Sequence, residues 1–205
     1  MARRTGKIVT APIWCLVFLW SMATGASAAP QDPKAFIQTL GNEALGLLQQ
    51  QELAPDQRVA QFRQLFVRGF DVDKISRLVL GRYWRKATAA EREEFRRVFE
   101  DFIVKTYADR LSNYSGETFT IQSAMKRNET ESVVQSTIVR PTGPPTRVDW
   151  RIDAASGEQR IVDVAIEGVS MLVTQRSEFA SVIQSNGGKV SGLIEALRKQ
   201  INRLN

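Results

Sequence analysis

Apolar residues recur every three or four positions through the first half of the chain, and this spacing is typical of amphipathic helices. Three such stripes occur, at 36–48, at 59–66 and at 95–111. Pro55 stands just ahead of the second stripe, where a proline in the first helical turn sacrifices no hydrogen bond. The third stripe is broad and leaves one polar face, which predicts a helix packed on a core.

Residues suited to capping mark where further helices begin. Asp71 and Asp73 are candidate caps for a short helix that runs through Leu80. Thr88 and Glu91 have the spacing of a capping box, in which each side chain accepts from the other residue's backbone N–H. The first half of the chain therefore predicts four helices.

The hydrophobic period changes to two in the second half, which predicts β-strands. Four β-rich runs follow one another, at 118–121, 132–139, 148–153 and 162–167. Turn-forming residues at 141–145 and 154–157 separate the last three runs, and helical stripes return after Gly168 and from Ser191. The order ααααββββαα predicts an α+β fold, in which a helical layer packs on a curled four-stranded antiparallel sheet.

Residues 1–28 have the features of a secretory signal peptide. Three basic residues precede an apolar run at 8–20, and Ala26-Ser27-Ala28 has the form of a signal-peptidase site. The run is shorter than the ~20 residues of a spanning helix, which favours cleavage over an uncleaved anchor. The Arg3-Arg4 pair is a weak match to a twin-arginine signal, so Sec-type export is expected. We predict a single mature domain over 29–205.

Histidine is absent from the chain, and the single cysteine, Cys15, lies within the predicted signal peptide. Cys15 stands inside the apolar run rather than behind small residues at its end, so we expect no lipid anchor there. The mature domain therefore has no Ser-His-Asp triad, no Cys/His nucleophile pair, no His/Cys metal cage and no disulfide. We expect no catalytic residue, no metal and no cofactor.

Removal of the signal lowers the net charge. The chain has 28 Lys and Arg against 22 Asp and Glu, and three of the basic residues lie in the signal, so residues 29–205 carry a formal charge of +3. This small net positive charge argues against a nucleic-acid partner. The remaining length is enough for one apolar core.

The segment from Phe70 to Tyr114 concentrates several uncommon features. It resembles the core of the MlaC family of periplasmic phospholipid-shuttle proteins, also called toluene-tolerance proteins of the Ttg2D type. The matching positions are Phe70, Asp71, Ile75, Ser76, Leu80, Gly81, Trp84, Arg85, Ala87, Thr88, Thr106, Tyr107, Ala108, Arg110 and Leu111. A second block at 162–179 resembles the family's strand, E-G-V-S turn and following helix.

This resemblance implies a soluble, monomeric periplasmic carrier without enzymatic activity. Such a carrier shuttles phospholipid between an outer-membrane lipoprotein complex and an inner-membrane ABC transporter, which maintains outer-membrane lipid asymmetry. The chain departs from the family pattern at Gln159-Arg160 and at 174–176, both near the expected cavity mouth. Hopanoid-associated relatives share the same blocks, so a triterpenoid cargo is an alternative. A structural or interaction module, which would need no cavity, is a further alternative. A cone-shaped α+β isomerase or hydrolase is a weaker one, because carboxylates or tyrosine would have to do its acid–base work.

A carrier must enclose acyl chains, and a cleft between sheet and helices can do this with apolar side chains alone. The residues we expect to contact lipid are Phe99, Phe102, Ile103, Val148, Trp150, Ile152, Val162, Val164, Ile166, Met171 and Leu172. Ordinary core packing is the alternative role for each of them. Asp163 alternates to the outer face, where a solvated side chain is expected.

A basic and aromatic run follows the short helix, at Arg82, Tyr83, Trp84, Arg85 and Lys86. One interpretation is a docking patch for lipid headgroups or a partner protein. The other is a helix C-terminus, at which Arg85 and Lys86 offset the helix dipole and Trp84 packs inward. The sequence leaves both interpretations open.

Overall fold

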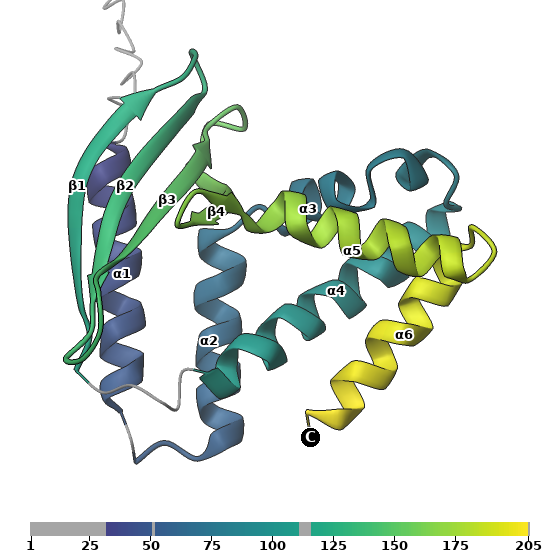
Figure 1. Ribbon diagram of the computed structural model, residues 1–205, viewed down its shortest axis with the longest axis horizontal. Coiled ribbons are helices and arrows are strands. Elements are labelled where there is room, and N and C mark those ends of the chain that lie inside the picture. The colour runs from purple at the N-terminus through teal and green to yellow at the C-terminus, as the bar shows by residue number, and fades with distance from the viewer. Residues whose placement is uncertain (1–31, 51, 111–115, 205) are drawn as a thin grey trace, which may run out of the picture. The chain divides into compact units, whose positions relative to one another are not determined.

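Six α-helices, one 3-10 helix and five strands make up the residues that the computed structural model describes, namely 32–50, 52–110 and 116–204 (Figure 1). In chain order they are α1 (Pro33–Gln49), α2 (Pro55–Gly69), α3 (Val72–Leu80), η1 (Gly81–Arg85), α4 (Ala89–Arg110), β1 (Thr118–Lys126), β2 (Glu131–Val139), β3 (Thr146–Asp153), β4 (Arg160–Ile166), β5 (Val169–Ser170), α5 (Met171–Ser185) and α6 (Val190–Arg203). The predicted α+β class is confirmed. The predicted signal peptide and its cleavage site lie outside the described residues.

The local signals at the helix starts act as predicted. Pro55 is the first residue of α2. Asp71 caps α3, its Oδ1 accepting from the backbone N–H three residues on at 2.8 Å, whereas Asp73 lies in the first turn. Ahead of α4, the Thr88 N–H donates to Glu91 Oε2 at 2.8 Å and the Glu91 N–H donates to Thr88 Oγ1 at 3.1 Å. The capping box is therefore confirmed.

The sheet is antiparallel throughout and has the order β1-β2-β3-β4-β5. It has one strand more than the four that the sequence predicts, because the short β5 folds back on the end of β4 and pairs Val169 with Ile166. The turn between them is Glu167-Gly168, with φ values of 50° and 81°. Two consecutive positive φ values are what a two-residue hairpin turn requires.

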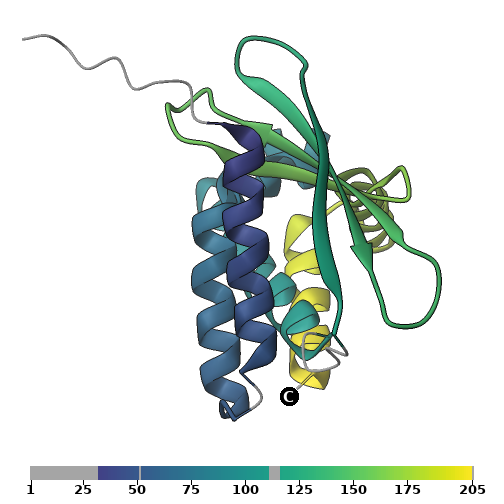
Figure 2. The same cartoon turned by 90° about the vertical axis from the view of Figure 1, so that its left-hand side faces the viewer.

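The helices contact the sheet at two places. α1 lies along β1 and β2, while α2 contacts α1, α4 and β4. α5 follows β5, contacts β4 and packs on α3, and α6 then packs on α4. Figure 2 shows α1 and α2 side by side next to the strands, and Figure 1 shows α4, α5 and α6 beyond the β4 side of the sheet. The α3–α6 part therefore meets the sheet mainly along β4.

Two main apolar clusters correspond to these contacts. The larger cluster joins α3, α4, α5 and α6 around Phe179, whose ring meets those of Phe95 and Phe99 edge to face at 5.9 and 6.0 Å. The other joins Ile37 of α1 to three residues of the sheet, Val134, Ile152 and Ile161. Phe70 packs against both clusters and so links the helical part to the sheet.

Backbone and charge contacts close the seam between the helices and the sheet. Phe70 pairs with Ile161 in an isolated parallel bridge, and the Asp71 N–H donates to the Ile161 carbonyl at 3.0 Å. Lys74 of α3 forms an ion pair with Asp153 of β3, whose side chain is 8% exposed. Burial raises the pKa of Asp153, but hydrogen bonds from Lys74 and from the backbone outweigh burial and hold that pKa below its usual value.

Candidate functional site

A cavity of about 570 Å³ lies between the sheet and the helices. Most of its wall is apolar and comes from α1, α2, α3, α4, β3, β4 and α5. Its volume falls within the ~300–1,000 Å³ that is usual for small-molecule sites. A second hollow of about 550 Å³ along α1 is lined mainly by polar and charged residues, including Glu43, Arg68 and Arg160. Because only the first offers an apolar container, it is the candidate site.

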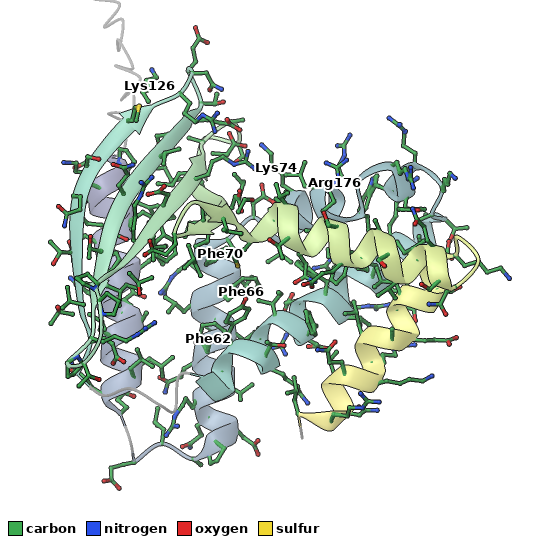
Figure 3. All side chains as sticks on the ribbon, viewed as in Figure 1. Phe62, Phe66, Phe70, Lys74, Lys126 and Arg176 are labelled. Atoms are coloured by element: carbon green, nitrogen blue, oxygen red, sulfur yellow. The ribbon has the colours of Figure 1, made fainter. Side chains whose placement is uncertain are left out.

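Phenylalanines at four-residue intervals form one wall of the cavity (Figure 3). Phe62, Phe66 and Phe70 therefore lie on one face of α2 and its C-terminal end. The ring centroids are 6.4 Å apart for Phe62 and Phe66, and 4.8 Å apart for Phe66 and Phe70. Phe99 and Phe102 of α4 add to the same lining. These rings present large, rigid apolar surface without a hydrogen-bonding group.

Nine of the eleven residues that the sequence suggests for lipid contact line this cavity, namely Phe99, Phe102, Ile103, Trp150, Val162, Val164, Ile166, Met171 and Leu172. The other two, Val148 and Ile152, are 4% and 1% exposed and lie outside the wall. They belong to the core rather than to the cavity, and Ile152 packs with Ile37 and Ile161. Contact of the nine residues with lipid stays a prediction.

Much of the wall comes from residues that sequence reasoning leaves as plain helix faces. α1 and α2 contribute, among others, Ile37, Leu40, Ala44, Leu65 and Phe66. Their helical spacing is visible in the sequence. Spacing shows which face of a helix is buried, but not whether that face borders packed atoms or an empty volume.

Ile161 is missed for a different reason, which is a β-bulge at the start of β4. The register between β3 and β4 shifts between Arg151 and Ile152, so that Ile152 faces Ile161 and Arg151 faces Asp163. Val162 is left as the extra residue. Strict alternation from Val162 onwards therefore does not find Ile161, although it lines the cavity.

Trp150 of β3 is held in the cavity wall by a buried polar anchor. Its Nε1–H donates to Ser136 Oγ at 2.8 Å, and that hydroxyl donates to the Val148 carbonyl at 3.1 Å. Ser136 is fully buried. The indole ring also meets Phe119 of β1 edge to face, with centroids 6.2 Å apart. These contacts fix the orientation of the ring beside the cavity.

Asp163 is not the solvated side chain that the sequence predicts. Its carboxylate accepts from Ser170 Oγ at 2.6 Å and from the Leu172 N–H at 3.0 Å. Ser170 is the N-cap residue of α5, and its Oγ accepts from the Val173 N–H at 3.1 Å. An anion at this position meets unpaired N–H groups and the positive end of the helix dipole. Asp163 therefore anchors the start of α5, which borders the cavity.

Polar residues of the wall lie on β4, α4, α5 and α6, and those of α4 are Thr106 and Tyr107. Thr174, Gln175 and Glu178 of α5 border the cavity together with Gln200 of α6. Gln175 Nε2 donates to Glu178 Oε2 at 3.2 Å. Among the described residues, no lysine or arginine lines the cavity. The charged side chains of the wall are therefore Glu178 and Asp163, and both are acidic.

The basic and aromatic run after α3 divides between two environments. Tyr83 is 4% exposed and Trp84 packs against the helical core, so the two rings do not form an exposed aromatic surface. Hydrogen bonds with Arg82 and with Gln184 lower the pKa of Tyr83 below its usual value. Arg82, Arg85 and Lys86 are exposed. Docking through these three cations stays a prediction.

Enclosure of apolar material is what this arrangement can do chemically. Within 32–50, 52–110 and 116–204, no three metal-ligating side chains come together. No helix in the same ranges is both long and apolar enough to cross a bilayer. Of the two carboxylates in the cavity wall, Asp163 is engaged at the start of α5. The site therefore suits binding of an apolar ligand.

Comparison with known sequences points to one family. The family model described as MlaC protein matches residues 38–199. The intermembrane phospholipid transport system binding protein MlaC of Haemophilus influenzae is 28% identical over 113 residues. The match covers 53% of this chain, and the chain spans about half of that relative's own length, 53%. The toluene tolerance protein ttg2D of Pseudomonas putida is 23% identical over 174 residues, which is 82% of this chain and 81% of that protein.

A solved structure has the same fold. It is a phospholipid-binding protein from Ralstonia solanacearum in complex with a phospholipid, and it matches with a TM-score of 0.76 at 24% sequence identity. The match covers 85% of this chain and 99% of the other. At this identity the likeness establishes the arrangement of helices and strands.

Proposed function

The chain belongs to the MlaC protein family, and on that premise we propose that it is a carrier that binds phospholipid in the cavity between its sheet and its helices. The observation that carries the proposal is the cavity itself, about 570 Å³ with a largely apolar wall. The names of the relatives support it, since one is a binding protein of intermembrane phospholipid transport. The fold is also that of a protein solved with a phospholipid.

The physical need for such a container follows from the cost of exposing acyl chains. A diacyl lipid presents roughly 30 methylenes to water at about 0.8 kcal/mol each, so free passage between membranes costs on the order of 20 kcal/mol. Apolar walls from Phe62, Phe66, Trp150 and Val164 replace that water. No catalytic group is needed for this task.

The route that we propose runs between two membranes. The domain over 29–205, exported by the Sec-type pathway, works in the periplasm as a monomer. It receives and delivers lipid at an outer-membrane lipoprotein complex and at an inner-membrane ABC transporter. Arg82, Arg85 and Lys86 are exposed and form the charged surface through which we expect it to meet them.

Native mass spectrometry of the purified protein, followed by lipid extraction, tests the proposal. We expect an intact mass that starts near Ala29 and a bound phospholipid. Val164→Trp places a large ring in the cavity and should lower the lipid content, whereas Val67→Trp is a matched control on an exposed, non-lining position of α2. Circular dichroism and melting should confirm that both variants fold.

Three outcomes would contradict parts of the proposal. An extract without lipid from the parent protein contradicts the carrier function. A triterpenoid in place of phospholipid keeps the container but changes the cargo. Native lipid content in a folded Val164→Trp variant would show that Val164 is ordinary core.

A further inference from the structure

The charged side chains that line the cavity are all acidic among the described residues. Enclosure of acyl chains alone does not explain this. The described residues that line the cavity include two carboxylates, those of Asp163 and Glu178, and no lysine or arginine. The Asp163 carboxylate already accepts two hydrogen bonds at the start of α5. Glu178 is exposed, and its carboxylate accepts from the side-chain amide of Gln175 at 3.2 Å. Glu178 is therefore the exposed carboxylate of the cavity wall that a ligand could meet.

The cavity wall changes character along α5. Met171, Thr174, Gln175 and Glu178 recur at helical spacing and line the cavity, so one face of α5 borders it from the first turn to the third. At the first turn the α5 side chains that line the cavity, Met171 and Leu172, are apolar, although the engaged Asp163 carboxylate of β4 lies beside them. At the third turn this face ends in Glu178. The part of the cavity wall that α5 provides thus changes from apolar to polar side chains along the helix.

We propose that the polar part of the cavity wall that includes Gln175, Glu178 and Gln200 selects lipids whose headgroup carries an ammonium group over lipids whose headgroup is net anionic. The inference rests on the proposed function and adds the class of headgroup. The phosphate of a net anionic lipid would lie near the Glu178 carboxylate, and no lysine or arginine among the described lining residues could pair with it. A zwitterionic headgroup offers its ammonium to the Glu178 carboxylate.

The nearest arginine along α5 does not supply the missing positive charge. A Cβ atom built on Gly81 would lie 2.7 Å from Arg176 Nε, so the guanidinium packs over the end of α3. Figure 3 labels Arg176 on the α3 side of α5. Arg176 is also not among the cavity-lining residues. The guanidinium therefore borders α3 rather than the cavity.

The size of the preference follows from the exposure of Glu178. Exposed ion pairs contribute up to about 1 kcal/mol, which corresponds to a preference of at most about fivefold. We therefore expect a two- to fivefold enrichment and not absolute selectivity. Glu178→Gln should abolish the enrichment, and Glu178→Lys should reverse it.

The experiment loads the protein from vesicles that hold equal amounts of phosphatidylethanolamine and phosphatidylglycerol with identical acyl chains. Protein is separated from vesicles, and the extracted lipids are quantified by mass spectrometry. Glu195→Lys is the matched control, because Glu195 is an exposed residue of α6 that does not line the cavity. It makes the same change in net charge as Glu178→Lys and so corrects for attraction to anionic vesicles.

The expected result is enrichment of phosphatidylethanolamine in the parent and in Glu195→Lys, with the reverse in Glu178→Lys. A vesicle-like ratio in fully loaded parent protein, unchanged by Glu178→Lys, overturns the headgroup preference and leaves the carrier function intact. Absence of both lipids from the parent overturns the carrier function itself. Circular dichroism of each variant confirms that it is folded.

Discussion

Truncation of Trp150 measures how much the packing of the cavity wall contributes to the free energy of unfolding. Trp150→Ala removes a ring that lines the cavity, meets Phe119 edge to face and donates to Ser136. Loss of a large aromatic side chain from a core costs about 3–5 kcal/mol. Because Trp150 is partly exposed and borders an empty volume, we expect the lower end, about 3 kcal/mol. For a domain of this size each kcal/mol lowers Tm by about 2–4 °C, so Tm should fall by about 6–12 °C.

Two milder variants separate the ring from its hydrogen bond. Trp150→Phe keeps an aromatic ring and loses the N–H, which should cost about 1 kcal/mol, since Ser136 can still donate to the Val148 carbonyl. Ser136→Ala leaves the indole N–H without its acceptor and should cost about 1–3 kcal/mol. If both variants act on the same bond, the double variant should cost less than the sum of the two.

Urea unfolding of lipid-free protein is the appropriate assay, because bound lipid adds stability that depends on its concentration. Far-UV circular dichroism provides the signal for all four variants. A cost below about 1 kcal/mol for Trp150→Ala would refute the reasoning, since a packed aromatic side chain of this kind is expected to cost more. Strict additivity of Trp150→Phe and Ser136→Ala would refute the hydrogen bond.

Asp153→Asn should lower the free energy of unfolding at pH 7 by about 1–3 kcal/mol, because it deprives Lys74 of its charged partner. The folded pKa of Asp153 lies below its unfolded value of about 3.9, so this stability is complete above that pH and is lost as pH falls through the folded pKa. Urea unfolding should show the difference shrinking below about pH 4, and a constant difference contradicts the ion pair. Changing Arg82, Arg85 and Lys86 together to Glu should slow lipid transfer to acceptor complexes at low salt but leave co-purified lipid unchanged, because exposed charges steer encounter and are screened over ~10 Å. Equal stopped-flow transfer rates for this variant and the parent would contradict a docking role for the three residues.

The helices were predictable because their start signals act within one turn of the chain. Pro55, Asp71 and the Thr88–Glu91 box each involve residues at most three positions apart, so no knowledge of the tertiary structure is needed. β5 is the opposite case. A strand of two residues has no period to detect, and only its pairing with the end of β4 defines it.

The sequence predicted which face of each strand is buried, but not whether a residue on that face borders the cavity or packed core. Val148 and Trp150 alternate to the same side of β3, yet Trp150 lines the cavity and Val148 does not. The difference depends on what the helices leave empty, which alternation does not report. Asp163 shows the same limit, since alternation takes no account of the return of the chain through β5, which brings the N-terminus of α5 to the carboxylate.

The packing of α1 against the sheet has a consequence for the order in which the chain can fold. Ile37 shares a cluster with Ile161, and the two are 124 positions apart. Chains are synthesised from the N-terminus, so α1 emerges long before β4. Contacts that close such a long loop form late, because the chain loses conformational entropy on closing the loop before the contact contributes any stabilisation. Although α1 can meet α2 early, its contacts with the sheet are thus among the last to form, and the apolar face that they cover stays open to chaperones in the interval.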